Sequence, residues 1–155
     1  MANLFQDVLF DELKTRALVE QYGSPLLLLD CEKLADQYRQ LSTALPGVGL
    51  YYAVKAFPHS AIVNTLNQLG ARFDIASTGE INLLRKQKVN PRNTIHTHPI
   101  KKDKDIKDAL RFGCSTFVVD NHAEIRKFRK YAHRVGLSLR VAFRSPHCAL
   151  DSSRK

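Results

Sequence analysis

Short apolar runs recur along this 155-residue chain at intervals of roughly 20 residues, and segments with helical spacing of apolar residues fill the gaps. The runs read LLLLD, LYYAV, RFDIA, TIHTH, TFVVD and SLRVAF, and they begin near Leu26, Leu50, Arg72, Thr94, Thr116 and Ser138. Strand-like runs that alternate with helices are typical of βαβ units and a parallel sheet. The pattern therefore predicts an α/β protein with about five to six βα units.

The helical segments carry boundary signals of their own. The segment STGEINLLRKQ opens with Ser77 and Glu80 at the spacing of a capping box, which satisfies free backbone N–H groups at a helix start. Three other helical segments end on Gly70, Gly113 and Gly136, and glycine favours the left-handed conformation in which many helices end. These signals predict helices, rather than long loops, between the apolar runs.

Two parallel-sheet architectures fit this alternation. A doubly wound sheet of five or six strands would be complete at this length, whereas a (β/α)8 barrel typically needs about 250 residues. Length alone favours the doubly wound sheet, which should carry a glycine-rich turn after its first strand. The first run is followed by CEKLA without glycine, and the close pair Gly47 and Gly49 precedes a strand. Motifs must therefore decide between the two architectures.

Polar residues follow several apolar runs directly, at the expected carboxyl ends of the strands. Barrels and open α/β sheets both build their sites at this end. Lys55 directly follows YYAV. Because desolvating an ammonium group is costly, a lysine at the end of an apolar strand suggests a function. The alternative is an ordinary solvated loop lysine. The other polar residues are Asp74 and Ser77, His96 and His98, Asp120 and Asn121, and, within the last run, Arg140.

Some of these positions have simple structural explanations. His96 and His98 would share one face of a strand and could bind a metal, but spacing places no third ligand, so we predict no metal site. Asp120 is most simply the N-cap of the next helix. Asp74 is harder to dismiss, because it lies between two apolar strand residues and needs a cation or a hydrogen-bond donor as partner.

These motifs resemble one family, the pyridoxal-phosphate (PLP) decarboxylases with an alanine-racemase-like barrel, which include ornithine, diaminopimelate and arginine decarboxylases. YYAVKAFPHSAIVNTLNQLGARFDIASTGEINLL is similar to the family's YAVKAN…FD.AS.GE block, and THPIKKDKDIKDALRFGCSTFVVDN is similar to the block after it. LRVAFRSPHCALDSSRK resembles a segment that runs on into a K-F-G motif. The resemblance implies that residues 1–155 are the N-terminal part of a PLP-binding (β/α)8 barrel, without the family's C-terminal β-domain.

The resemblance also implies roles for individual residues. Lys55 would be the catalytic lysine that binds PLP as a Schiff base, Asp74 and Arg140 would be further cofactor-binding residues, and Glu80 would support them. The implied reaction is PLP-dependent decarboxylation of a basic amino acid, of the ornithine type in polyamine biosynthesis. The implied assembly is a homodimer in the cytoplasm, with an amino acid as small-molecule substrate.

Other features of the family are missing from this sequence. A glycine-rich phosphate loop, an acid for the pyridine nitrogen and substrate-binding residues would all follow Lys155, and Phe57 and His98 stand where asparagine is usual. We therefore expect a truncated and inactive portion of a decarboxylase. The alternatives are a non-catalytic regulatory homologue and a racemase-like or PLP-homeostasis barrel, although proteins of the latter kind lack the FD.AS.GE block.

Charge and composition change this interpretation little. The net charge of +9 would suit a nucleic-acid partner, but the basic residues are spread over helical segments among acids and apolar positions, so we predict no such partner. No apolar run approaches the roughly 20 residues of a membrane helix, and the N-terminus lacks a signal-peptide pattern. We expect a cytoplasmic protein that does not contact a membrane.

Overall fold

The computed structural model describes residues 12–135 and 140–143, and the chain divides into two compact units, Met1–Asp30 and Cys31–Lys155. The first unit contains helix α1 (Glu12–Tyr22) in its described part. The second unit contains the strands and the remaining helices of the described chain. Over these described ranges, no helix is long and apolar enough to cross a membrane.

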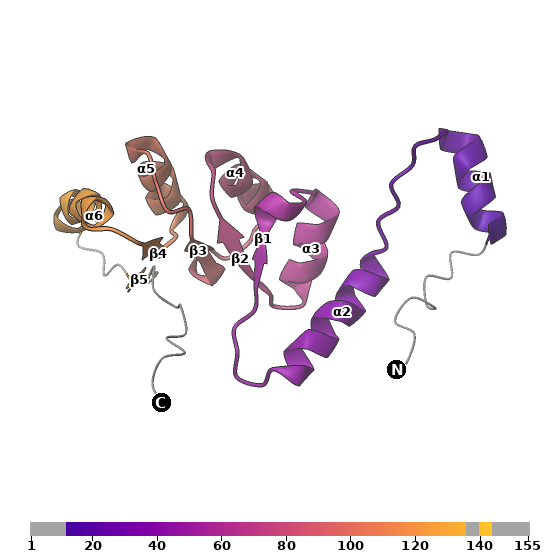
Figure 1. The fold of residues 1–155 in the computed structure, drawn as a ribbon, viewed down its shortest axis with the longest axis horizontal. Coiled ribbons are helices and arrows are strands. Elements are labelled where there is room, and N and C mark those ends of the chain that lie inside the picture. The colour runs from indigo at the N-terminus through magenta and orange to yellow at the C-terminus, as the bar shows by residue number, and fades with distance from the viewer. Residues whose placement is uncertain (1–11, 136–139, 144–155) are drawn as a thin grey trace, which may run out of the picture. The chain divides into compact units, whose positions relative to one another are not determined.

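The described strands form one five-stranded sheet in which neighbours run parallel and follow the order of the sequence (Figure 1). A doubly wound sheet reverses its strand order at a switch point, whereas a barrel adds each strand beside the previous one. The order β1 to β5 therefore identifies part of a (β/α)8 barrel and confirms the fold expected from the motifs. The strands are β1 (Tyr51–Ala53), β2 (Arg72–Ile75), β3 (Thr94–His96), β4 (Thr116–Val119) and β5 (Arg140–Phe143).

The strand predicted at Leu26 is absent. Residues 26–30 form neither helix nor strand although they read LLLLD. Leu27 is 77% exposed and Leu29 is 39% exposed, so the run is not buried as a strand core would be. A strand is held by backbone hydrogen bonds to a neighbouring strand, and apolar composition alone does not supply that neighbour. This prediction is therefore wrong, and the sheet begins at β1.

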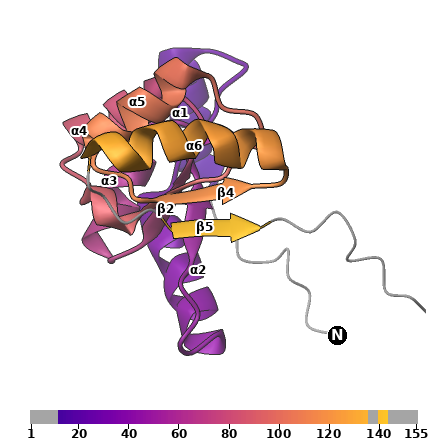
Figure 2. The same cartoon turned by 90° about the vertical axis from the view of Figure 1, so that its left-hand side faces the viewer.

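Helices cover one face of the sheet, as Figures 1 and 2 show for α3 to α6. Each of these four helices follows one strand and precedes the next, which is the βα repeat that the spacing of apolar runs predicted. The helices are α2 (Cys31–Ala44), α3 (Ser60–Gln68), α4 (Thr78–Lys86), α5 (Asp103–Phe112) and α6 (His122–Val135), and two 3-10 turns are η1 (Val54–Ala56) and η2 (Pro91–Asn93). Helix α2 precedes the sheet and packs against α3.

The hydrophobic core lies between the sheet and these helices. Phe73 and Ile75 of β2 are fully buried, while Asp74 between them lies on the opposite face and is half-buried. Phe117 of β4 is also fully buried, and its ring centroid lies 4.7 Å from that of Phe128 on α6. The face away from the helices is therefore the one on which β2 carries its acid, Asp74.

The N-cap that the capping-box spacing predicted at the start of α4 is confirmed, and Glu80 accepts from the Ala76 N–H instead of the Ser77 N–H of a capping box. The Ser77 hydroxyl accepts a hydrogen bond from the Glu80 N–H at 3.4 Å and donates one to Glu80 Oε1 at 2.9 Å. The predicted glycine ends are also found at α3 and α5, where Gly70 and Gly113 have φ angles of 77° and 104°. Gly136 lies outside the described residues. Local sequence therefore predicted where these helices begin and end.

The predicted N-cap of α6 is wrong by one residue. Asn121 Oδ1 accepts the capping hydrogen bond from the Glu124 N–H at 2.9 Å, and α6 begins at His122. Asp120 instead accepts a hydrogen bond from Asn121 Nδ2 at 2.7 Å. Aspartate and asparagine cap helices about equally well, so the residue type at neighbouring positions did not distinguish them.

Candidate functional site

Lys55 lies in the 3-10 turn Val54–Ala56, immediately after β1. The side chain of Val54 is fully buried and anchors the turn in the core, whereas Lys55 is exposed. The Tyr52 hydroxyl donates a hydrogen bond to the Phe57 carbonyl oxygen at 3.1 Å, which ties the strand to the loop beyond the turn. Among the described residues, the Lys55 ammonium group forms neither an ion pair nor a hydrogen bond. The turn therefore presents an accessible amine on a fixed backbone.

Asp74 is the acid that the sheet brings to the same end. It pairs in register with Ala53 of β1 and with Ile95 of β3, so it sits in the strand next to Lys55. Burial raises the pKa of the Asp74 carboxyl, while hydrogen bonds from Thr97 and the positive charge of Lys55 act in the opposite direction. Asp74 thus has both kinds of partner that its position in a strand calls for, a donor and a cation.

Thr97 is the donor, and it is a residue that the sequence analysis missed. Its hydroxyl oxygen lies 2.7 Å from Oδ1 and 2.8 Å from Oδ2 of Asp74. Period-two alternation places Thr97 on the same side as Ile95, which is the strand partner of Asp74. That signal was present in TIHTH, but using it requires the register between β2 and β3, which a single sequence does not provide. We refer to Lys55, Asp74 and Thr97 as the Lys55 site.

Glu80 stabilises the loop that follows Asp74. Its Oε2 accepts a hydrogen bond from the Ala76 N–H at 2.9 Å, and its Oε1 accepts one from the Ser77 hydroxyl at 2.9 Å. A carboxylate in the first turn of a helix is also favoured by the helix dipole. Glu80 therefore fixes the backbone between Asp74 and α4. This position is compatible with the supporting role expected for Glu80.

His96 and His98, the histidines predicted at a strand end, are not gathered at the Lys55 site. His96 is fully buried on the helix side of β3, where its ring stacks on Phe117 at 5.9 Å, and burial is the main cause that lowers its pKa to about 4. His98 is exposed, and its Nδ1 accepts a hydrogen bond from the Ile100 N–H at 3.2 Å. The predicted common face of the two histidines is wrong, because β3 ends at His96. Arg140 begins β5, but its side chain lies outside what the structure describes.

A second lysine lies in a closed cluster that sequence patterns did not reveal. Lys101 is fully buried, and its Nζ donates to the Val118 carbonyl oxygen at 2.5 Å and lies 3.9 Å from Glu124 Oε2. Lys127 Nζ donates to Glu124 Oε1 at 2.6 Å and to the Lys101 carbonyl oxygen at 2.9 Å. Burial lowers the pKa of Lys101, and Glu124 opposes that change. This Lys101 cluster (Lys101, Glu124 and Lys127) ties the loop before α5 to β4 and α6.

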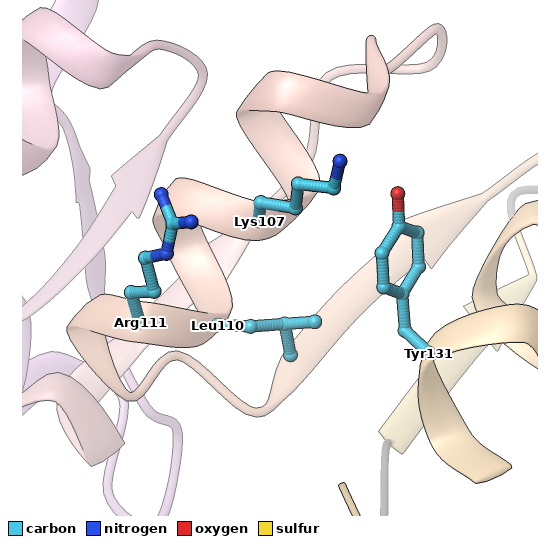
Figure 3. Close-up of a pocket in the computed structure, with 4 residues that line it drawn as sticks. All are labelled: Lys107, Leu110, Arg111 and Tyr131. Carbon is cyan, nitrogen blue, oxygen red and sulfur yellow. The ribbon is translucent and has the colours of Figure 1, made fainter. Parts of the chain in front are cut away.

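Surface hollows lie elsewhere on the described second unit. One of about 230 Å³ lies between α5 and α6, and Figure 3 shows side chains from both helices around it. Its lining residues are Lys107, Leu110, Arg111 and Tyr131. Another of about 200 Å³ lies between α2 and β1. Neither is lined by Lys55 or Asp74, so both hollows are separate from the Lys55 site.

Known proteins match this chain over most of its length. The family profile described as "pyridoxal-dependent decarboxylase, pyridoxal binding domain" matches residues 31–154. The lysine/ornithine decarboxylase of Selenomonas ruminantium is 29% identical over 93% of this chain and 37% of that protein. The diaminopimelate decarboxylase of Aquifex aeolicus is 26% identical over 89% of this chain and 33% of that protein. The crystal structure of lysine/ornithine decarboxylase from Vibrio vulnificus with putrescine matches with a TM-score of 0.78 and 50% identity, over 83% of this chain and 34% of that one.

These matches confirm the expected relationship, the partial barrel and PLP as the cofactor of the family. The chain spans only about a third of the length of the relatives that it matches. The roles of Lys55, Asp74, Glu80 and Arg140 stay predictions, because the matches do not test individual residues. On the strength of the match over residues 31–154, the chain belongs to the pyridoxal-dependent decarboxylase family, through its pyridoxal-binding domain.

Proposed function

We propose that this chain provides the lysine-bearing part of the cofactor site in a PLP-dependent decarboxylase of a basic amino acid, of the ornithine type in polyamine biosynthesis. The observation that carries the proposal is an exposed lysine, Lys55, beside a half-buried acid, Asp74, at the carboxyl end of adjacent parallel strands. Barrel enzymes build their active sites at this end. Relatives named for lysine, ornithine and diaminopimelate decarboxylation support the reaction class.

The chemistry of PLP fits the residues of the Lys55 site. An aldehyde cofactor needs a primary amine that it can reach, and Lys55 is exposed on an anchored turn. When bound, PLP supplies a sink for the electron pair that remains after carbon dioxide leaves. Lys55 would hold the cofactor covalently through Nζ. The Asp74 carboxylate would favour a proton on that nitrogen, because an opposite charge nearby stabilises the charged form.

Two further residues have supporting roles in this proposal. Glu80 would keep the backbone after Asp74 in place through its hydrogen bonds to Ala76 and Ser77. Arg140 would contribute a further cofactor contact from β5, and this role rests on the family resemblance, because Arg140 begins its strand. A fixed loop around the lysine matters because catalytic groups act only from a narrow range of positions.

The proposal extends to the whole enzyme. We propose that the 155-residue chain alone does not decarboxylate an amino acid, because it spans about a third of its relatives. We also propose that the complete enzyme is a cytoplasmic homodimer. These parts rest on the family resemblance.

The test of the cofactor lysine is reductive trapping. The chain is incubated with PLP, reduced with sodium borohydride and digested, and the labelled peptide is identified by mass spectrometry. We expect the label on Lys55, its loss in Lys55→Ala, and its retention in Lys104→Ala, which removes another exposed lysine. Equal labelling of many lysines, or a label that persists in Lys55→Ala at the same level, would overturn the proposal.

The test of the reaction is carbon dioxide release from ornithine and lysine. For the 155-residue chain we expect no release above the rate with free PLP. Release that is abolished in Lys55→Ala would contradict the proposed inactivity of this portion while supporting Lys55 as the catalytic lysine. Sedimentation equilibrium of the complete enzyme tests the homodimer, and a monomer at micromolar concentration would contradict it.

A further inference from the structure

We infer that Thr97 is a positioning residue of the Lys55 site, because its hydroxyl bridges both carboxylate oxygens of Asp74 and so fixes the orientation of that acid beside the cofactor lysine. The inference deepens the proposed function and rests on it for the role of Lys55. Thr97 itself is not expected to touch the cofactor or the substrate, so its effect would be exerted through Asp74.

The backbone around Thr97 is held independently of its side chain. Thr97 follows β3 directly, and its N–H donates a hydrogen bond to the Ile75 carbonyl oxygen of β2 at 3.3 Å. This bond continues the pairing of β2 with β3 by one residue beyond the last strand position. The hydroxyl therefore projects from a fixed point toward the residue that precedes Ile75, which is Asp74.

The side-chain geometry is that of a bridge rather than a single hydrogen bond. The hydroxyl oxygen of Thr97 lies 2.7 Å from one carboxylate oxygen of Asp74 and 2.8 Å from the other. A threonine hydroxyl has one proton, which two nearly equidistant acceptors share. Rotation of the Asp74 carboxylate about its last side-chain bond would lengthen one of these contacts, so the bridge opposes that rotation.

A hydrogen bond with a purely structural role would satisfy a polar group that water cannot reach. The Asp74 carboxyl group is not such a group. It is half-buried, so water could replace a missing donor. Lys55 is the charged group that faces Asp74, and Thr97 is the neutral donor. What water could not replace is the fixed orientation, which is the property that a catalytic arrangement needs.

The fold provides a matched control in a second threonine–aspartate pair. The Thr78 hydroxyl donates to Asp108 Oδ2 at 2.9 Å, between α4 and α5, and Asp108 is also approached by Arg111 at 3.5 Å. In this pair the hydroxyl contacts one carboxylate oxygen, and the bond joins two helices instead of two neighbouring strands. Substitution at Thr78 therefore reports what the loss of an ordinary Thr–Asp bond does to this protein.

The experiment measures the titration of Asp74 in the PLP-free chain by NMR of 13C-labelled aspartate side chains. Thr97→Val removes the hydroxyl while it keeps the shape of the side chain, and we expect the Asp74 midpoint to shift upward because the charged form loses a hydrogen bond. Thr97→Ser should restore the wild-type midpoint. Thr78→Val should leave the Asp74 midpoint unchanged. If Thr97→Val does not fold, Thr97→Ala carries the same comparison with Thr97→Ser.

A second readout connects the shift to the proposed lysine. The rate of borohydride-trapped PLP incorporation at Lys55 is measured as a function of pH. Compared with wild type, this pH profile should be displaced in Thr97→Val and unchanged in both Thr97→Ser and Thr78→Val. An Asp74 midpoint that is the same in wild type and Thr97→Val would overturn the inference, as would a shifted midpoint with an unchanged Lys55 profile. If wild type incorporates no PLP at Lys55, the proposed function fails and with it the positioning role, even where Asp74 shifts.

Discussion

Two lysines lie in loops that follow parallel strands, and their surroundings are opposite. Lys55 follows β1 and is exposed, with an acid nearby that acts on it through its charge. Lys101 lies between β3 and α5 and is fully buried. Its ammonium group donates a hydrogen bond to a carbonyl oxygen and forms an ion pair with a buried glutamate. A buried charge must be paired and hydrogen-bonded to be tolerated, so Lys101 is committed to the fold. Lys55 keeps its amine accessible, and that is what covalent chemistry requires.

The acids of the two groups differ in the same way. Glu124 is 3% exposed and contacts both Lys101 and Lys127, so its charge is fully used in holding three segments together. Asp74 is half-buried and is held by a neutral hydroxyl, which leaves its charge to act on Lys55. The comparison teaches that burial and pairing, rather than residue type, separate a structural lysine from a candidate catalytic one. Substitutions in the two groups should therefore have opposite effects on stability and on PLP incorporation.

The largest expected effect is loss of stability when the Lys101 cluster is broken. Glu124→Ala leaves Lys101 buried without its acid, and removing one partner of a buried ion pair typically costs about 3–5 kcal/mol. Urea unfolding followed by circular dichroism measures this change as a lower midpoint. The control is Glu20→Ala, which removes an exposed acid of α1 and should cost less than about 1 kcal/mol. A Glu124→Ala midpoint equal to that of the control would show that the cluster does not hold the fold together.

A pH dependence of similar size should come from His96, which lies on the buried side with Lys101. Its pKa in the folded protein is about 4, against an ordinary value of 6.5, because burial and the charge of Lys101 disfavour the protonated ring. The unfolded state therefore binds more protons between these two values, so the free energy of unfolding falls by about 3 kcal/mol as the pH drops from 6.5 to 4. Unfolding midpoints measured across this range should fall more steeply for wild type than for His96→Leu. Parallel slopes would contradict the prediction.

Local sequence predicted much of this fold and little of its long-range pairing. The strands near Arg72, Thr94 and Thr116 and the cap at Ser77 follow from signals within a few residues of each position. The strand predicted at Leu26 failed because a strand also needs a hydrogen-bonded neighbour, which no local pattern reports. Local signals therefore identified most strands and the cap at Ser77, but they could not show whether an apolar run has a strand to pair with.

The same distinction applies to the candidate site. Lys55 and Asp74 were found because carboxyl ends of parallel strands meet at one end of a sheet, so each could be judged from its own strand. Thr97 was missed because its partner lies on another strand and is set by the register. Lys101 was missed because nothing in THPIKK distinguishes a lysine that turns inward from its exposed neighbour Lys102. Side chains whose role depends on a partner far along the sequence require the structure.

A smaller effect should follow from weakening the loop that supports Asp74. Ser77→Ala removes the hydroxyl that caps α4 and contacts Glu80, and loss of an N-cap side chain typically costs about 1 kcal/mol. The matched control is Ser60→Ala in the first turn of α3, where His59 rather than Ser60 provides the capping atom. Urea midpoints should separate the two variants. Equal midpoints would show that the N-cap at Ser77 contributes nothing measurable to stability.

The smallest change in stability is expected at Lys55 itself. Lys55→Ala removes an exposed side chain that forms no ion pair or hydrogen bond among the described residues, and such surface substitutions usually stay within about 0.5 kcal/mol. The same variant should lose PLP incorporation at this position completely, whereas Glu20→Ala should retain it. Unfolding and trapping are measured on one preparation of each protein. If Lys55→Ala destabilised the chain as much as Glu124→Ala does, Lys55 would be a structural lysine like Lys101, and the contrast between the two would fail.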